Sequence, residues 1–314
     1  MATILNEVTC NDKYVNGGIP SCALKIKSLR GIFIGRQGGY IPTANLATVD
    51  GALDYLRDLS LDANPLNRFV FIPFSEATDN TKAPESKQTA FGLEEGVQEY
   101  PFMAEAKYLN YGIGFTEELR KMNEVQGKAC FIVDETFIGG KEGALGLYPI
   151  PCNFHANLPK FGNGGGTLTE NKLTIGFKNI NDLTTMKGIV LPDGYAVEDN
   201  FKGVLEVELT AVGGSGIITV TAKEKLSRLN IAETFATAIV QTGAWVVTKV
   251  SDGSPVTITG VTVSSGNVVL ATAFVGACKV KLAAPLVLEA LTTPLGGGSG
   301  ACFESNQVTA TTTA

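Results

Sequence analysis

Residues 254–274 read SPVTITGVTVSSGNVVLATAF, and this stretch decides the fold of the C-terminal part of the chain. Two runs, residues 256–263 and 268–274, are rich in Val, Ile and Thr and flank the sequence Ser-Ser-Gly-Asn. β-Branched residues pack well on a pleated sheet, and a short turn that contains glycine between two such runs is typical of a hairpin. The stretch therefore predicts two antiparallel strands joined by a tight turn.

The same signals recur on the N-terminal side of this hairpin. Residues 204–211 and 217–222 flank the turn Gly-Gly-Ser-Gly, and residues 245–250 precede an Asp-Gly turn. Short strands with turn signals at this spacing indicate a β-sandwich of immunoglobulin-like type over residues 204–291. Residues 292–314 are rich in Gly, Ser and Thr, which predicts a C-terminal arm or disordered tail.

A change of composition separates this region from the rest of the chain. The chain has 314 residues, which is long enough for two domains that each bury a core. From Val204 onward there are six Lys or Arg and seven Asp or Glu in 111 residues, about half the charge density of the first part. We therefore expect residues 1–200 to form a separate, mainly β domain.

Apolar patterning predicts the strands of this first domain. Alternation over residues 24–34 predicts a strand that closes in a glycine turn. Leucines at helical spacing predict a short helix over residues 50–61. Further apolar runs predict strands at residues 68–74, 129–133, 147–154, 172–177 and 186–191.

The strongest helix signal covers residues 116–126. Thr116 is a suitable N-cap, and two glutamates that follow it suit the positive end of the helix dipole. Gly127 can end the helix in the left-handed conformation. The strand predicted at residues 129–133 comes next, so this is a helix that leads into a sheet.

Residues 75–89 read SEATDNTKAPESKQT and are too polar for a packed core. They predict a long loop that projects into solvent or onto a neighbouring molecule, because loops of this length are usually functional or disordered. Its charged and hydroxyl side chains are candidates for contacts between subunits: Ser75, Asp79, Lys82, Glu85 and Lys87.

The charge and the histidine content argue against several functions. The net charge is -6 and the pI is about 5.0, whereas nucleic-acid binders need clustered Lys and Arg. His155 is the only histidine, so a His-rich metal site cannot be built and a Ser-His-Asp site would depend on this residue alone. Cys152 precedes it by three residues, which places the two on opposite faces of a strand. We expect no catalytic, cofactor or metal site.

Paired carboxylates are the remaining route to enzyme chemistry, as in glycoside hydrolysis. The candidate pairs are Glu94-Glu95, Glu117-Glu118 and Asp134-Glu135. The second pair is explained by the start of a helix, and the third follows a strand in what is predicted to be an exposed turn. A carbohydrate site also needs aromatic platforms, and the single Trp245 lies in an apolar strand of the other domain.

The sequence predicts an intracellular origin and no membrane span. The first eleven residues lack the basic start and the apolar run of a signal peptide, and no run of about 18 apolar residues occurs anywhere. A reducing cytoplasm would keep cysteines as thiols, so we interpret them as small core residues. The six cysteines are Cys10, Cys22, Cys130, Cys152, Cys278 and Cys302.

The order of these elements resembles the major tail tube proteins of long-tailed bacteriophages. The loop at 75–89, the helix at 116–126, the strand at 129–133 and the sandwich at 204–291 are similar to the parts of that family. The resemblance implies a tail-tube-like β-sandwich or barrel with a flanking helix over residues 1–200, followed by an immunoglobulin-like domain.

The resemblance implies a virion structural protein, assembled in the host cytoplasm, whose hexameric rings stack into a tube. Its partners would be copies of itself and other virion proteins, with double-stranded DNA only as passing cargo. An acidic lumen would let DNA slide, although a pI near 5.0 equally serves solubility. A phage capsid decoration protein, a head fibre and a surface adhesion module remain alternatives.

Overall fold

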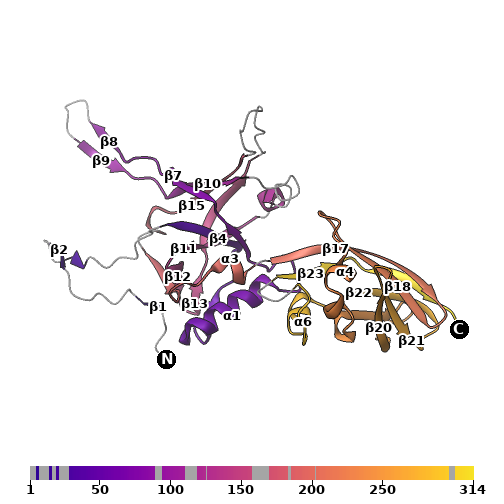
Figure 1. The fold of residues 1–314 in the computed structure, drawn as a ribbon. Helices are drawn as coiled ribbons and strands as arrows, with labels where there is room; N and C mark the ends of the chain where they lie inside the picture. The colour runs from indigo at the N-terminus through magenta and orange to yellow at the C-terminus, as the bar shows by residue number, and fades with distance from the viewer. Residues whose placement is uncertain are drawn as a thin grey trace. The chain divides into compact units, whose positions relative to one another are not determined.

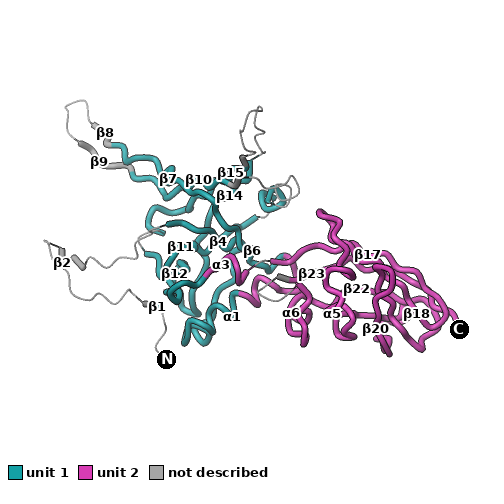
Figure 2. The backbone as a smooth tube through the Cα atoms, viewed as in Figure 1, with its two compact units in different colours: residues 1–56, 66–195 teal, residues 57–65, 196–314 magenta. Residues whose placement is uncertain are grey.

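A computed structural model gives the fold and divides the chain into two compact units (Figure 2). Unit 1 comprises residues 1–56 and 66–195, and unit 2 comprises residues 57–65 and 196–314. Both units are mainly β. The structure describes residues 5–6, 14–15, 19–20, 28–88, 94–109, 119–124, 126–157, 170–182, 185–201, 203–296 and 301–314.

Unit 1 is built on a 12-stranded sheet. Its main path runs β1-β16-β12-β11-β14-β15-β10-β7, and β4, β5, β6 and β13 join from the side. The bounds are β1 Leu5–Asn6, β4 Leu29–Arg36, β5 Ile41–Pro42, β6 Val70–Pro73, β7 Glu76–Asp79, β10 Met103–Leu109, β11 Lys128–Asp134, β12 Phe137–Gly143, β13 Gly146–Tyr148, β14 Ile150–Ala156, β15 Glu170–Phe177 and β16 Met186–Val190. Two short ribbons pair β2 (Tyr14–Val15) with β3 (Ile19–Pro20), and β8 (Glu85–Gln88) with β9 (Glu94–Gln98).

Strands β4 and β11 form the centre of the unit 1 core. They pair antiparallel along their whole length, with Phe33 opposite Phe131, and their middle residues are buried on both faces. Close packing across β4 requires glycine, because a Cβ on Gly35 would lie 2.9 Å from the ring of Phe69. A strand that is covered on both faces needs apolar residues at successive positions, which explains the continuous apolar run in the sequence of each strand.

The helices of unit 1 agree with the sequence in part. Helix α1 (Val49–Ser60) occupies the predicted place, with Leu53 and Leu56 buried. Residues 119–121 are helical and continue into the 3₁₀ turn η2 (Met122–Glu124), whereas Thr116 lies outside the described residues. Further 3₁₀ turns are η1 Asn45–Ala47 and η3 Ile180–Asp182.

The segment after η2 shows how this helix leads into the sheet. Gly127 has φ +63°, the left-handed conformation that the sequence predicts for it. The Asn123 side chain accepts from the Ala156 backbone nitrogen at 2.8 Å and donates to its carbonyl at 3.0 Å, which fixes η2 on strand β14.

The loop predicted at residues 75–89 is largely strand, and that prediction needs correction. β7 pairs antiparallel with β10, and β8 pairs with β9. Figure 1 shows β8 and β9 extending outward from β7 and β10. The alternation of apolar residues is absent because β7 lies at the sheet edge and its side chains are mostly exposed. This polar stretch projects from the sheet as expected. It does so as paired strands and not as a loop.

Unit 2 contains a five-stranded and a three-stranded sheet around one core. The first has the order β20-β21-β18-β17-β23 and the second β19-β22-β24. The bounds are β17 Gly203–Gly214, β18 Ile217–Glu224, β19 Trp245–Lys249, β20 Ile258–Ser264, β21 Asn267–Thr272, β22 Gly276–Leu282, β23 Ala301–Ser305 and β24 Val308–Thr312. Short helices α3 Val197–Asn200, α4 Ile231–Thr234, α5 Ala236–Ile239, η4 Thr242–Ala244 and α6 Pro285–Glu289 complete the unit.

Alternation along the strands places one face of each sheet in this core. Val207 and Leu209 of β17 are buried, and so are Val280 and Leu282 of β22. The predicted hairpins are present, since β17 pairs with β18 and β20 pairs with β21. Leu61, from the segment after α1, also joins this core, which the sequence did not indicate.

The prediction of a C-terminal arm at residues 292–314 is wrong for residues 301–305 and 308–312, which form strands. β23 pairs in parallel with β17, and β24 pairs antiparallel with β22. Cys302, Phe303 and Ala310 are buried, so these strands complete both sheets. Composition suggested a tail because Ser and Thr are common in linkers, but small side chains also suit a strand with one buried face.

The four described cysteines, Cys130, Cys152, Cys278 and Cys302, are buried free thiols, as the sequence predicted. Cys10 and Cys22 lie outside the described residues. None of the described helices combines the length and apolar character needed to cross a membrane.

Candidate functional site

The paired strands β7 and β10, with β8 and β9 beyond them, form the β7–β10 hairpin. A cluster of three polar side chains lies at its base, where the chain passes from β7 to β8 and from β9 to β10. Lys82 Nζ lies 2.6 Å from Glu85 Oε1 and 3.0 Å from the Tyr100 hydroxyl, which in turn donates to Glu85 Oε2 at 2.9 Å. The same ammonium lies 4.4 Å from the centre of the Tyr100 ring. These contacts tie the strand leaving β7 to the strand returning to β10.

The cluster shifts the titration of both charged groups. Hydrogen bonds from Lys82 and then from Tyr100 lower the pKa of Glu85, and the bond to Glu85 is the main cause that raises the pKa of Lys82. The ion pair is therefore intact at neutral pH. Both side chains are solvent-exposed, so the pair contributes little to stability. Its role is to connect the two sides of the hairpin at the base.

A second set of contacts anchors the hairpin to β10. Asp79 Oδ1 accepts from the Thr81 backbone nitrogen at 2.8 Å, the short-range turn that aspartate favours. The Thr81 hydroxyl then accepts from the Met103 backbone nitrogen at 3.0 Å. The chain is therefore held in a defined direction where it leaves the sheet.

A groove of about 380 Å³ lies beside this base, on the outer face of β10, β14 and β15. Its floor is apolar, and Asn153, His155 and Thr174 supply polar groups at its rim. The cross-strand register places His155 opposite Thr174, and Thr174 opposite Glu105. Residues that line the groove are Lys82, Tyr100, Pro101, Phe102, Met103, Asn153, Phe154, His155, Thr174, Gly176 and Phe177.

The structure brings together only some of the predicted contact residues. Lys82 and Glu85 touch, and Asp79 shapes the turn beside them. Ser75 is exposed just before β7, and Lys87 lies in β8, where its side chain is not among those described. Sequence reasoning missed Tyr100, because its partners lie more than a dozen residues away along the chain.

The other candidate groups lie apart from this cluster, on β14 and near the end of β11. His155 is exposed on β14, and Cys152 faces the core on the opposite side of the strand, as predicted. Asp134 is not in an exposed turn: it is 1% exposed and accepts from the Ser28 backbone nitrogen at 2.9 Å and from Thr136. Glu135 is exposed and lies 3.8 Å from Arg30.

The side chains of the remaining carboxylate pairs are not described by the structure. Glu94 and Glu95 lie in β9 with side chains that are not described, and Glu117 and Glu118 fall outside the described residues. Within the described part of the chain, no group of three or more His, Cys, Asp or Glu is placed to hold a metal ion.

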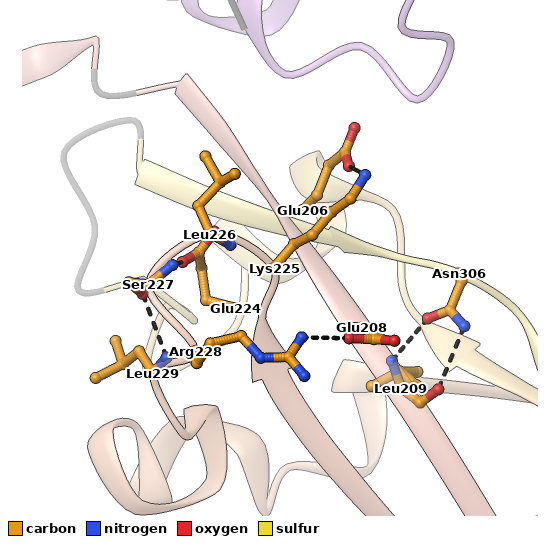
Figure 3. Close-up of polar contacts among 10 residues, drawn as sticks. All are labelled: Glu206, Glu208, Leu209, Glu224, Lys225, Leu226, Ser227, Arg228, Leu229 and Asn306. Atoms are coloured by element: carbon orange, nitrogen blue, oxygen red, sulfur yellow. Dashed lines mark hydrogen bonds and ion pairs between the residues drawn. The ribbon is translucent and has the colours of Figure 1, made fainter. Parts of the chain in front are cut away.

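Unit 2 contains a second groove, of about 410 Å³, beside a tightly held loop (Figure 3). Glu206 pairs with Lys225, and Glu208 pairs with Arg228. In the parallel register Glu206 lies opposite Glu304. The groove is lined by Glu206, Val207, Glu208, Lys225, Glu304, Ser305 and Asn306.

The loop beside this groove is organised by one buried carboxylate. Glu224 is 4% exposed, and it accepts from the Leu226 backbone nitrogen at 2.9 Å and from the Ser227 backbone nitrogen (Figure 3). Arg228 has φ +60°, a conformation that a non-glycine residue adopts only when its surroundings impose it. Leu226 remains 46% exposed on this rigid loop.

The Glu224→Ala variant is expected to destabilise unit 2 by about 1–3 kcal/mol, because it removes the charged acceptor of two backbone hydrogen bonds that hold the loop. Burial raises the pKa of Glu224, but the hydrogen bonds from Ser227 and Leu226 outweigh it and lower the pKa below its ordinary value. The contribution is therefore full above the ordinary glutamate pKa and is lost as pH falls through the lowered value.

Urea unfolding of the full chain at several pH values measures this effect. Glu198→Ala, at an exposed glutamate in α3, is the matched control and should change stability by less than about 0.5 kcal/mol. Equal stability of the two variants at neutral pH would show that Glu224 does not hold the loop.

Trp245 does not provide a sugar platform. It is 5% exposed, and its Nε1–H donates to the Ile239 carbonyl at 2.9 Å within the core. Its role is therefore to connect strand β19 with helix α5.

No protein-family model matches this chain, and no curated protein does either. The projecting hairpin, the groove at its base and the acidic groove of unit 2 are therefore interpreted from their own geometry.

Proposed function

We propose that the chain is a virion structural protein that assembles with copies of itself into stacked rings, as in a phage tail tube. The observation that supports this most is the β7–β10 hairpin, which extends from the unit 1 sheet as a polar two-stranded ribbon (Figure 1). Its direction is fixed at the base by Lys82, Glu85 and Tyr100.

An isolated two-stranded ribbon is marginally stable in water, because it has no core of its own. Ordering such a ribbon also costs backbone entropy. A neighbouring subunit that covers the ribbon would offset this cost, and the sheet edge at β7 offers unpaired backbone groups for the same purpose. Self-assembly gives both features a role.

The charge of the chain fits this proposal. A net charge of -6 opposes attraction to phosphate, so DNA would pass as cargo without being bound. The groove beside the hairpin base would then contact a neighbouring copy, with His155 and Asn153 at its rim.

Negative-stain electron microscopy of the purified full chain over a range of concentrations tests the proposal, together with its mass in solution. Stacked rings or hollow tubes are the expected result. A monomer or trimer that never polymerises would contradict the tube and favour a capsid decoration protein or head fibre. A monomer that adheres to cells would favour a surface adhesion module.

A further inference from the structure

Strand β20 is one edge of the five-stranded sheet in unit 2, and it pairs with β21 alone. Ser265 and Gly266 both have positive φ, 50° and 73°, which is the type I′ turn of a two-residue hairpin. In such a hairpin Ser264 and Asn267 exchange backbone hydrogen bonds, and every second pair along the ladder does the same. Val261 and Val263 therefore direct their N–H and C=O groups away from β21.

No backbone partner of these outward groups is found in the described part of unit 2. Among the residues that the structure describes, the backbone hydrogen bonds outside the ladders reach neither Val261 nor Val263. The side chains of both valines pack against the core but are only partly buried. The edge is thus incomplete in its backbone bonding and in its apolar cover.

The edge also lacks charged residues, which are one common protection against pairing. Proteins commonly place charges on edge strands, but no charged residue occurs from Gly253 to Cys278. A bulge between Ile258 and Gly260 disturbs only the start of β20 and leaves Gly260 to Ser264 regular.

The other edges of unit 2 differ from β20. Strand β23 carries Glu304 and β19 carries Lys249. Strand β24 packs closely on β17, where a Cβ on Gly213 would lie 1.9 Å from the Thr311 carbonyl oxygen. An uncharged and regular edge is therefore a feature of β20 in particular.

We propose that β20 pairs antiparallel with β20 of a second copy of this chain. A two-fold axis at Thr262 would place Val261 of each copy opposite Val263 of the other, and each such pair would exchange two backbone hydrogen bonds. The neutral sequence opposes no like charges when it pairs with itself. The five-stranded sheets of the two copies then form one continuous sheet.

A contact between two short strands buries little surface, so it is weak between free molecules. It becomes significant where another contact already holds copies together, because tethering raises the effective concentration to the millimolar range. The pairing of β20 does not depend on the proposed tube, since any assembly that brings two copies of unit 2 together suffices.

Thr262→Cys in the full chain tests the register. The two cysteines would face each other at a pair that exchanges no hydrogen bonds, where Cα atoms are about 4.5 Å apart and a disulfide can form. Ser264→Cys is the matched control, because its counterpart in the second copy would be about 13 Å away along the strand. Mild oxidation and a non-reducing gel measure the dimer, and the wild-type chain gives the background from native cysteines.

Thr262→Cys is expected to cross-link about tenfold faster than Ser264→Cys. Equal rates for the two variants, or no dimer above background for either at high protein concentration, would overturn the proposal.

A second comparison uses lysine substitutions. Thr262→Lys should abolish the β20 contact in sedimentation measurements, whereas Thr210→Lys, at an exposed position of β17 opposite Thr221 of β18, should not. Equal masses for the two lysine variants would also contradict it.

Discussion

Deletion of residues 308–314 is expected to unfold unit 2, although these residues read as a tail. The deletion removes β24, which pairs with β22 from Gly276 to Val280, and it uncovers Cys278 and Val280 in the core. Both the ladder and the apolar cover of the three-stranded sheet would be lost. Thermal unfolding of the truncated chain, followed by near-ultraviolet circular dichroism at Trp245, measures the loss.

Trp245 is the single tryptophan and lies in the unit 2 core, so its signal reports on that unit. The transition of unit 1 should persist, because its core shares no residue with β24. An unchanged tryptophan signal after the deletion would mean that the segment is the arm that composition suggests.

A single substitution in β24 tests the contribution of a buried side chain without shortening the chain. Thr312 is 1% exposed, and its hydroxyl donates to the Phe274 carbonyl at 2.6 Å and accepts from the Gly276 backbone nitrogen at 3.2 Å. Thr312→Val keeps the shape and should cost about 1–3 kcal/mol, because both partners lose their bond. Thr311→Val, at the exposed neighbour, should remain within about 0.5 kcal/mol of the wild type.

Replacing residues 83–99 with a short Gly-Ser linker is expected to abolish polymerisation while unit 1 stays folded. The Asn80 backbone nitrogen donates to the Met103 carbonyl at 2.8 Å, so the two sides of the base lie close together and a short linker can join Lys82 to Tyr100. Phe102 is retained, because its ring packs 5.1 Å from Phe177 in the core. Electron microscopy and thermal unfolding of the variant give the two readouts.

Charge-changing substitutions at Lys82 and Glu85 test the same contact while the hairpin is kept. Lys82→Glu places two carboxylates together and should weaken assembly, and Lys82→Glu with Glu85→Lys should restore it by reversing the pair. Tubes that form normally without the hairpin would show that another surface of unit 1 makes the contact between rings.

The hairpins of unit 2 could be predicted because their signals are local. Ser265 and Gly266 adopt the positive φ that their turn demands, and Val, Ile and Thr alternate on both sides. The same holds for Gly127, which ends its helical segment in the left-handed conformation. In each case the information lies within a few residues, so no distant contact has to be known.

The candidate site could be predicted only in its outline. The polar character of residues 75–89 indicates projection from the core, but it does not indicate that β7 would pair with β10. Tyr100 joins Lys82 and Glu85 only because the chain returns beside itself. Asp134 reads as an exposed turn residue and is buried, since Ser28 lies beside it in the fold.

The sequence by itself determined a mainly β chain with two regions of different composition, the strands with strong alternation, the turns and the burial of the described cysteines. Only the tertiary structure decided that residues 301–305 and 308–312 are strands, that Leu61 belongs to the unit 2 core and that β20 is an edge strand. The physical reason is that strand pairing joins residues far apart in the chain. Thr favours strands and Gly disfavours them, so a segment that mixes the two gives no clear local signal and its partner strands decide its conformation.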